Sequence, residues 1–90
     1  MGSILNEKRS FPAEKGSLQQ CLDYIEQTLA AAGRSGRESM KALLLAEELL
    51  PLFIHHARPG AEIQIQVRRL LGNVSLSVRC GGEPFVLSEV

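Results

Sequence analysis

A chain of 90 residues, 44% of them hydrophobic, is large enough for one small domain. Its ten basic and ten acidic residues cancel, so no net field favours DNA, RNA or an anionic membrane as a partner. The longest stretch without glycine or a basic residue, 42–54, contains Glu47, Glu48 and Pro51 and falls short of the roughly 20 apolar residues of a membrane span. We therefore expect residues 1–90 to form a single soluble domain, with no nucleic-acid partner and no direct membrane insertion.

The two cysteines, Cys21 and Cys80, match neither a C-x-x-C motif nor the spacing of a disulfide-dense scaffold. The first six residues lack the apolar run of a signal peptide. Both features favour a cytoplasmic protein with free thiols, and a Cys21–Cys80 disulfide is the alternative.

The N-terminal residues 1–8 are expected to be flexible, and a short strand is expected around Arg9 to Phe11. Pro12 follows at once and has no amide hydrogen for a sheet ladder. We therefore expect this strand to lie at the edge of a sheet.

A first helix is predicted over 17–33, because Ser17 and Gln20 form a capping-box pattern and Gly33 follows the last apolar residue. Its apolar residues recur at helical spacing and comprise Leu18, Cys21, Leu22, Ile25, Leu29 and Ala32. The other side of this helix is polar and comprises Gln19, Asp23, Tyr24 and Gln27, which could face water or a partner.

A second helix is predicted over 35–58, because Ser35 and Glu38 repeat the capping pattern and Pro59-Gly60 ends the periodicity. Its expected apolar stripe comprises Met40, Leu43, Leu44, Leu50, Ile54 and Ala57. Pro51 removes an amide hydrogen bond inside this helix, so we expect a kink at residues 47–51. The short connection between the helices predicts that they pack side by side in opposite directions.

Two strands are predicted over 62–70 and 73–80, where apolar residues alternate with polar ones. The apolar positions are Ile63, Ile65, Val67, Val74, Leu76 and Val78. Gly72-Asn73 suits the positive φ angles of a tight hairpin, and Gly81-Gly82 indicates a further turn. The fold class is therefore α+β: a two-layer sandwich of two antiparallel helices on a small antiparallel sheet, in the order β-α-α-β-β, with a short final strand allowed.

One strip of the second helix combines polar and apolar groups at a spacing of three or four residues: Leu45, Glu48, Leu52 and His56. A carboxylate that accepts a proton and an imidazole that donates one could activate water or bind phosphate. The alternative is an ordinary helix surface whose leucines are covered by a neighbour. His55 and His56 are adjacent and point apart on a helix, so we expect no metal site there.

The segment 46–57, Ala-Glu-Glu-Leu-Leu-Pro-Leu-Phe-Ile-His-His-Ala, resembles the Glu-x-x-x-Asn-x-x-x-His-Ala helix of the histidine-kinase-like ATPases, especially the anti-sigma-factor serine kinase branch. In that family a strand and a helix precede the motif helix, and a hairpin follows it. The second hairpin strand then runs into an Asp-x-Gly-x-Pro-Phe-like turn, which is similar to Cys-Gly-Gly-Glu-Pro-Phe at 80–85. The resemblance covers residues 10–87 and implies the N-terminal part of that fold.

The resemblance places Glu48 where the family's glutamate polarises a water or hydroxyl, so Glu48 is the one candidate catalytic residue. It places His56 at the end of the motif helix, and His56 and Gly82 would border a vestigial nucleotide groove. Leu52 falls where the family's asparagine coordinates Mg²⁺, and a leucine has no oxygen for a hard cation. Cys80 falls where an aspartate reads the adenine amino group, which a thiol cannot replace.

The family also has a further helix, a glycine-rich lid and more strands after this point. We therefore expect no cofactor, no metal ligand and no phosphoryl transfer. The leading hypothesis is a non-catalytic regulatory or protein-interaction module derived from such an ATPase, in the setting of a larger protein. Its partner would be another protein or a second copy, because an unpaired sheet edge favours a homodimer.

Two alternatives belong to other classes. The first is an ATP-binding, anti-sigma-factor-like serine kinase that uses Glu48 with ATP and Mg²⁺. The second is an unrelated structural α+β domain whose Glu-Glu and His-His pairs match the motif by chance.

Overall fold

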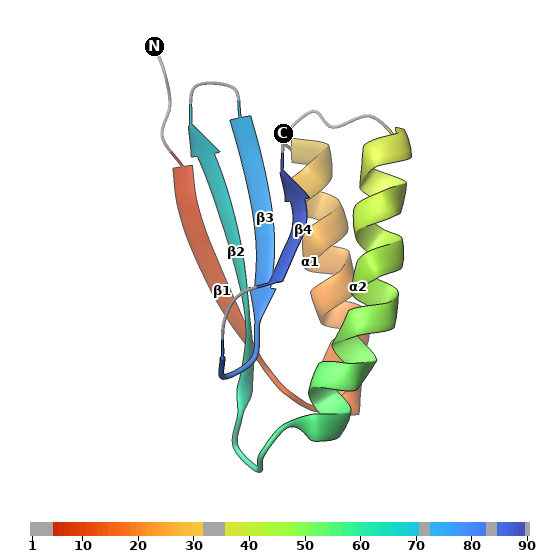
Figure 1. Ribbon diagram of the computed structural model, residues 1–90, viewed down its shortest axis with the longest axis vertical. Helices are drawn as coiled ribbons and strands as arrows, with labels where there is room; N and C mark the ends of the chain where they lie inside the picture. The colour runs from red at the N-terminus through yellow and green to blue at the C-terminus, as the bar shows by residue number, and fades with distance from the viewer. Residues whose placement is uncertain (1–4, 32–35, 71–72, 83–84, 90) are drawn as a thin grey trace.

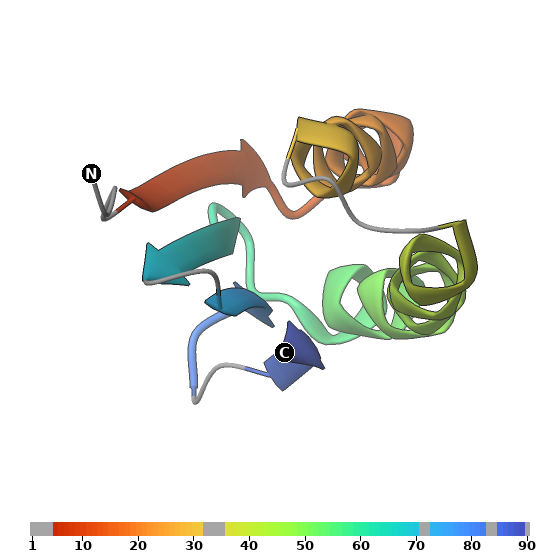
Figure 2. The ribbon, with the colours of Figure 1, turned by 90° about the horizontal axis from the view of Figure 1, so that it is seen from above.

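The computed structural model describes residues 5–31, 36–70, 73–82 and 85–89. These form, in chain order, β1 (Leu5–Pro12), a 3-10 turn (Lys15–Ser17), α1 (Leu18–Ala31), α2 (Gly36–His56), β2 (Glu62–Leu70), β3 (Asn73–Arg79) and β4 (Phe85–Glu89). The strands make one antiparallel sheet in the order β1-β2-β3-β4, and both helices cover the same face of it (Figure 1; Figure 2). The predicted two-layer α+β class is confirmed, including its final strand.

Strand β1 is longer than the sequence pattern indicates. It begins at Leu5, so residues 5–8 belong to the sheet and the expectation that they are flexible is wrong. The cause is pairing with β2, which runs without interruption from Leu5 opposite Arg69 to Pro12 opposite Glu62. Pro12 ends the strand, and β1 is an edge strand as predicted.

Helix α1 begins one residue later than predicted. Ser17 lies inside the 3-10 turn, whose N-cap is Glu14, so Ser17 is not the cap of α1. The predicted apolar face is confirmed: Cys21, Ile25 and Leu29 are buried. The predicted end at Gly33 lies outside the described residues.

Helix α2 starts at Gly36 within the described residues and continues through Pro51 to His56. Its inward face differs from the predicted stripe. Met40 and Leu44, expected in the core, are 61% and 53% exposed, whereas Ala42 and Ala46 are fully buried. Two alanines on the inner face let the helix axis approach its neighbours closely, so the buried side is rotated away from the larger residues.

Strands β2 and β3 pair as the predicted antiparallel hairpin, in a register that places Ile65 opposite Val78 and Val67 opposite Leu76. These four side chains and Ile63 are at most 2% exposed and lie under the helices. The predicted alternation is therefore confirmed in the described part of the hairpin, and its turn at Leu71 and Gly72 lies outside it.

Strand β4 pairs with β3, and the register shifts between Leu76 and Ser77. This bulge gives β4 an extra residue, Leu87, which is 6% exposed and belongs to the core. Strand β4 also contacts α2, so the two form one side of the molecule, opposite the side formed by β1 and α1 (Figure 2). In the described ranges neither helix is both long and apolar enough to cross a bilayer.

Candidate functional site

The predicted strip of α2 lies on the outside of the molecule. Leu45 is 41% and Leu52 is 55% exposed, and Glu48 and His56 are also classed as exposed. Glu48 and His56 therefore share one solvent-facing strip, as the helical spacing predicts. At the position that the resemblance aligns with the family's metal-coordinating asparagine, the strip presents the Leu52 side chain, which cannot coordinate a cation.

The two histidines at the end of α2 lie with their ring centroids 4.9 Å apart in an edge-to-face arrangement. Both rings are exposed. Among the described residues no group of three His, Cys, Asp or Glu side chains is placed to hold a metal ion.

The end of β3 places Cys80 and the two following glycines on different sides of the sheet. Cys80 is half-buried and packs against the core beneath the helices. Gly81 has a φ of 77°, a conformation that favours glycine, which explains the predicted turn. Gly82 lines a hollow of about 370 Å³ with Ser10, Gln64 and Arg79, which belong to the sheet face that the helices leave open.

Glu48, His56 and Gly82 are thus not brought to a common hollow in the described part of the chain. Two further hollows are formed by described residues, and Glu48 and His56 line neither of them. Gly82 belongs to the open sheet face, whereas the strip lies on α2. The resemblance groups these residues around a groove, and that grouping stays a prediction.

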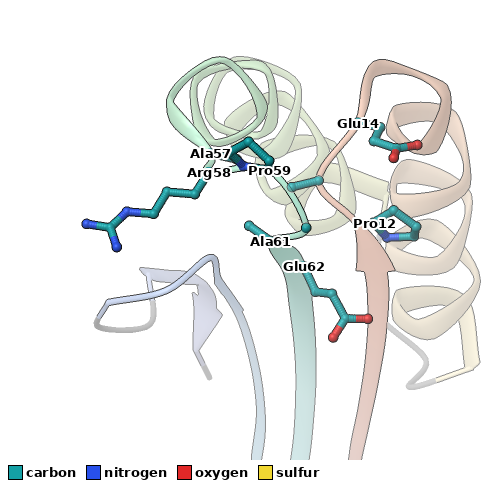
Figure 3. A pocket seen from close by; sticks show the side chains of 9 residues that line it. Pro12, Glu14, Ala57, Arg58, Pro59, Ala61 and Glu62 are labelled. Atoms are coloured by element: carbon teal, nitrogen blue, oxygen red, sulfur yellow. The ribbon is translucent and has the colours of Figure 1, made fainter.

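The largest of the three hollows, about 520 Å³, lies where β1 and β2 meet the end of α2. Its lining comprises Pro12, Ala13, Glu14, Ala57, Arg58, Pro59, Gly60, Ala61 and Glu62, with no hydroxyl, thiol or imidazole. Figure 3 shows the Arg58 side chain extending away from Glu14 and Glu62, so the three charges do not converge. A hydrogen bond of 3.0 Å from the Ala13 amide to the Ala61 carbonyl joins its two walls. This hollow is best explained as a junction between elements.

The open face of the sheet is polar and carries the exposed cations Lys8, Arg68 and Arg79. Its side chains hydrogen-bond to one another across strands. Gln66 Nε2 donates to Asn6 Oδ1 at 2.8 Å, and Arg79 Nη2 donates to Gln64 Oε1 at 3.2 Å. Such cross-strand pairs are common on the solvent-exposed face of an antiparallel sheet.

A polar contact between β1 and α1 was not predicted from the sequence. Tyr24, expected on the polar side of the first helix, is only 7% exposed, and its hydroxyl donates to Glu7 Oε1 at 2.6 Å. The Arg9 guanidinium lies 5.1 Å from the Phe11 ring centroid and 5.2 Å from that of Tyr24. The alternation of Glu7, Arg9 and Phe11 could have indicated that all three face the helix layer.

Burial and the hydrogen bond to Glu7 raise the pKa of the Tyr24 hydroxyl to about 12. The Glu7 charge also raises this pKa, while a hydrogen bond with Thr28 and the Arg9 charge act in the opposite direction. Tyr24 therefore stays a neutral hydrogen-bond donor throughout the physiological range. The contact fastens α1 to the edge strand.

The two cysteines are free thiols. Cys21 is fully buried in α1, and burial raises the pKa of its thiol to about 11. A thiol with so high a pKa is protonated near neutral pH and is a weak nucleophile. Cys21 is therefore a core residue, as its place in the apolar stripe predicts.

The exposed large apolar side chains of the described residues gather on the α2–β4 side of the molecule. They are Met40, Leu44, Leu45 and Leu52 on α2, with Phe85 and Val86 on β4. Val86 pairs with Ser77 and therefore faces the open side of the sheet. The opposite edge, β1, exposes only polar or charged residues from Asn6 to Ser10, a composition that discourages pairing with another strand. The α2–β4 side is therefore the candidate functional surface. Compared with models of known protein families and with curated proteins, the chain has no match.

Proposed function

We propose that this chain is a non-catalytic protein-interaction module that binds a protein through the outer face of α2. The observation that carries the proposal is the cluster of four exposed apolar side chains on that face: Met40, Leu44, Leu45 and Leu52. Single exposed apolar residues are common on soluble proteins, whereas four large ones on the outer side of one helix indicate an interaction surface.

The free energy gained by covering these side chains is large enough to support an interface. Covering one exposed leucine stabilises a complex by up to about 1.5–3 kcal/mol, before the cost of association is subtracted. Leu44 and Leu52 are each more than half exposed, so both retain most of this contribution for a partner. Phe85, on the strand that contacts α2, is a further large apolar side chain with 43% of its surface exposed.

The non-catalytic part of the proposal rests on two positions. Leu52 and Cys80 stand where the resemblance to histidine-kinase-like ATPases requires a metal ligand and an adenine-binding carboxylate. A module derived from that fold would lose nucleotide binding through these two changes. The free thiols of Cys21 and Cys80 support a location in the reducing cytoplasm.

The test uses a photo-crosslinking amino acid at position 44, with position 27 on α1 as the matched control, in the cells that produce the protein. Gln27 is also an exposed helix position but has no large exposed apolar residue within four positions of it on α1. We expect one discrete covalent protein adduct from position 44 and none from position 27. Equal, diffuse labelling from both positions would contradict the interaction function.

Calorimetry with ATP and Mg²⁺ tests the non-catalytic part separately. We expect no heat of binding for the purified chain. Saturable, Mg²⁺-dependent heat of ATP binding would instead support the serine-kinase alternative and overturn the proposal.

A further inference from the structure

We infer that the partner of the α2 face is a second copy of this chain, bound so that the two α2 helices run antiparallel about a two-fold axis between Leu44 and Leu45. This inference rests on the proposed function and names its partner. It follows from how apolar and charged residues are distributed along the exposed face of α2.

The centre of the exposed face is apolar. Leu44 and Leu45 are 53% and 41% exposed and lie near the middle of the 21-residue helix. In an antiparallel pair centred between them, Leu44 of each copy lies opposite Leu45 of the other. Two copies therefore contribute four leucines to one contact, which is the hydrophobic centre that a stable interface needs.

Charges flank this centre in a self-complementary order. Lys41 lies three residues before Leu44, and Glu48 lies three residues after Leu45. Antiparallel packing about the same axis places Lys41 of each copy opposite Glu48 of the other, so the symmetry creates two identical ion pairs. Parallel packing would place Lys41 against Lys41 and Glu48 against Glu48, which is repulsive.

These two charges are available for such pairing. Lys41 and Glu48 are both exposed, and in the described part of the chain neither has an ion-pair partner. They lie seven residues apart, about 10 Å along the helix axis, which is too far for a direct ion pair within one copy. At that separation they lie on the same side of the helix and can both reach a facing helix.

The other surfaces do not offer the same self-complementarity. The open sheet face carries three exposed cations, Lys8, Arg68 and Arg79, against one exposed carboxylate, Glu62, so a two-fold contact there would leave an excess of positive charge. Strand β1 exposes charged residues along its edge. A second copy therefore matches α2 better than either of these surfaces.

The test exchanges the two charges in the purified chain and measures association by sedimentation velocity over a range of concentrations. We expect wild type to dimerise, and Lys41→Glu and Glu48→Lys to raise the dissociation constant about tenfold or more, because each variant converts two attractive contacts into two repulsive ones. Glu26→Lys on the exposed face of α1 is the control and should leave the dissociation constant unchanged.

The decisive sample is an equimolar mixture of Lys41→Glu and Glu48→Lys. In a mixed dimer both contacts again join opposite charges, so we expect the mixture to dimerise at least as tightly as wild type. The double variant Lys41→Glu/Glu48→Lys should also regain dimerisation. No effect within one copy can restore association in a mixture, so recovery there shows that the two charges act between copies. In the double variant, parallel packing would still oppose like charges, so recovery of its dimer is specific for the antiparallel contact.

Two outcomes would overturn the inference: a wild-type chain that stays monomeric up to millimolar concentration, or a mixture that associates no better than its components. The photo-crosslinking experiment separates this failure from that of the proposed function. An adduct between position 44 and a different protein would contradict the homodimer but agree with the interaction module. The absence of any adduct would contradict both proposals.

Discussion

The two helices cover the same sheet, yet their outer faces differ. Helix α1 exposes Gln19, Asp23, Glu26 and Gln27, and Gln19 Nε2 donates to Asp23 Oδ1 at 2.9 Å. Helix α2 instead exposes large apolar side chains, with Leu52 at 55%. A helix that faces only water gains nothing from exposed leucines. The difference indicates that α1 is a solvent-facing helix, whereas α2 has a second apolar face that a partner can cover.

The inner faces of the two helices should respond alike to cavity-forming substitutions. Ile25 on α1 and Leu50 on α2 are both fully buried. We expect Ile25→Ala and Leu50→Ala each to lower the free energy of unfolding by about 2–5 kcal/mol, measured by urea denaturation. A loss below about 1 kcal/mol at either site would show that the corresponding helix is not firmly packed on the sheet.

The outer faces should respond differently. Leu44→Gln/Leu45→Gln removes four leucines from the proposed dimer contact while keeping good helix formers. We expect the dissociation constant of the dimer to rise at least about a hundredfold, measured by sedimentation velocity. The free energy of unfolding of the monomer should change by less than about 0.5 kcal/mol per site, because both positions are exposed. A large loss of monomer stability would instead place these leucines in the core.

The Tyr24–Glu7 hydrogen bond joins α1 to β1 and should make the free energy of unfolding depend on pH. We expect no such contribution from α2. The pKa of Tyr24 is raised from 10.0 to about 12 in the folded protein. A raised folded pKa means that the stabilisation is fully present below pH 10 and is lost as pH rises toward 12. We expect Tyr24→Phe to lower the free energy of unfolding by about 1 kcal/mol at pH 7. Between pH 10 and pH 12 the free energy of unfolding should fall less in Tyr24→Phe than in the wild type, because the variant has no hydroxyl to ionise. Parallel pH profiles for both proteins would contradict this role of Tyr24.

Much of the fold was predictable because local patterns are strong in this chain. Period-two alternation located both hairpin strands, whose described bounds agree with the prediction to within one residue. The predicted helix α1 has the predicted buried face, since its apolar residues form one narrow stripe. The buried face of α2 was less predictable because apolar residues lie on most sides of this helix. Periodicity alone could not show that Ala42 and Ala46 are buried while Met40 and Leu44 are exposed.

The strip that carries Glu48 and His56 was predicted as one face, and the structure places both residues on the outer surface of α2. The link from that strip to Gly82 came from the resemblance, and the structure assigns Gly82 to a hollow on the open sheet face. The Tyr24–Glu7 contact joins residues 17 positions apart, a long-range contact that local propensity does not contain.

By itself the amino-acid sequence determined which segments are helices and strands, because hydrophobic period and turn residues act locally. It also determined that α2 carries more apolar residues than one face can bury. Only the tertiary structure decided which of them are covered, because that depends on where the sheet, α1 and β4 sit around the helix. Tertiary packing buries Ala42, Ala46 and Leu50 and leaves Leu44, Leu45 and Leu52 for a partner.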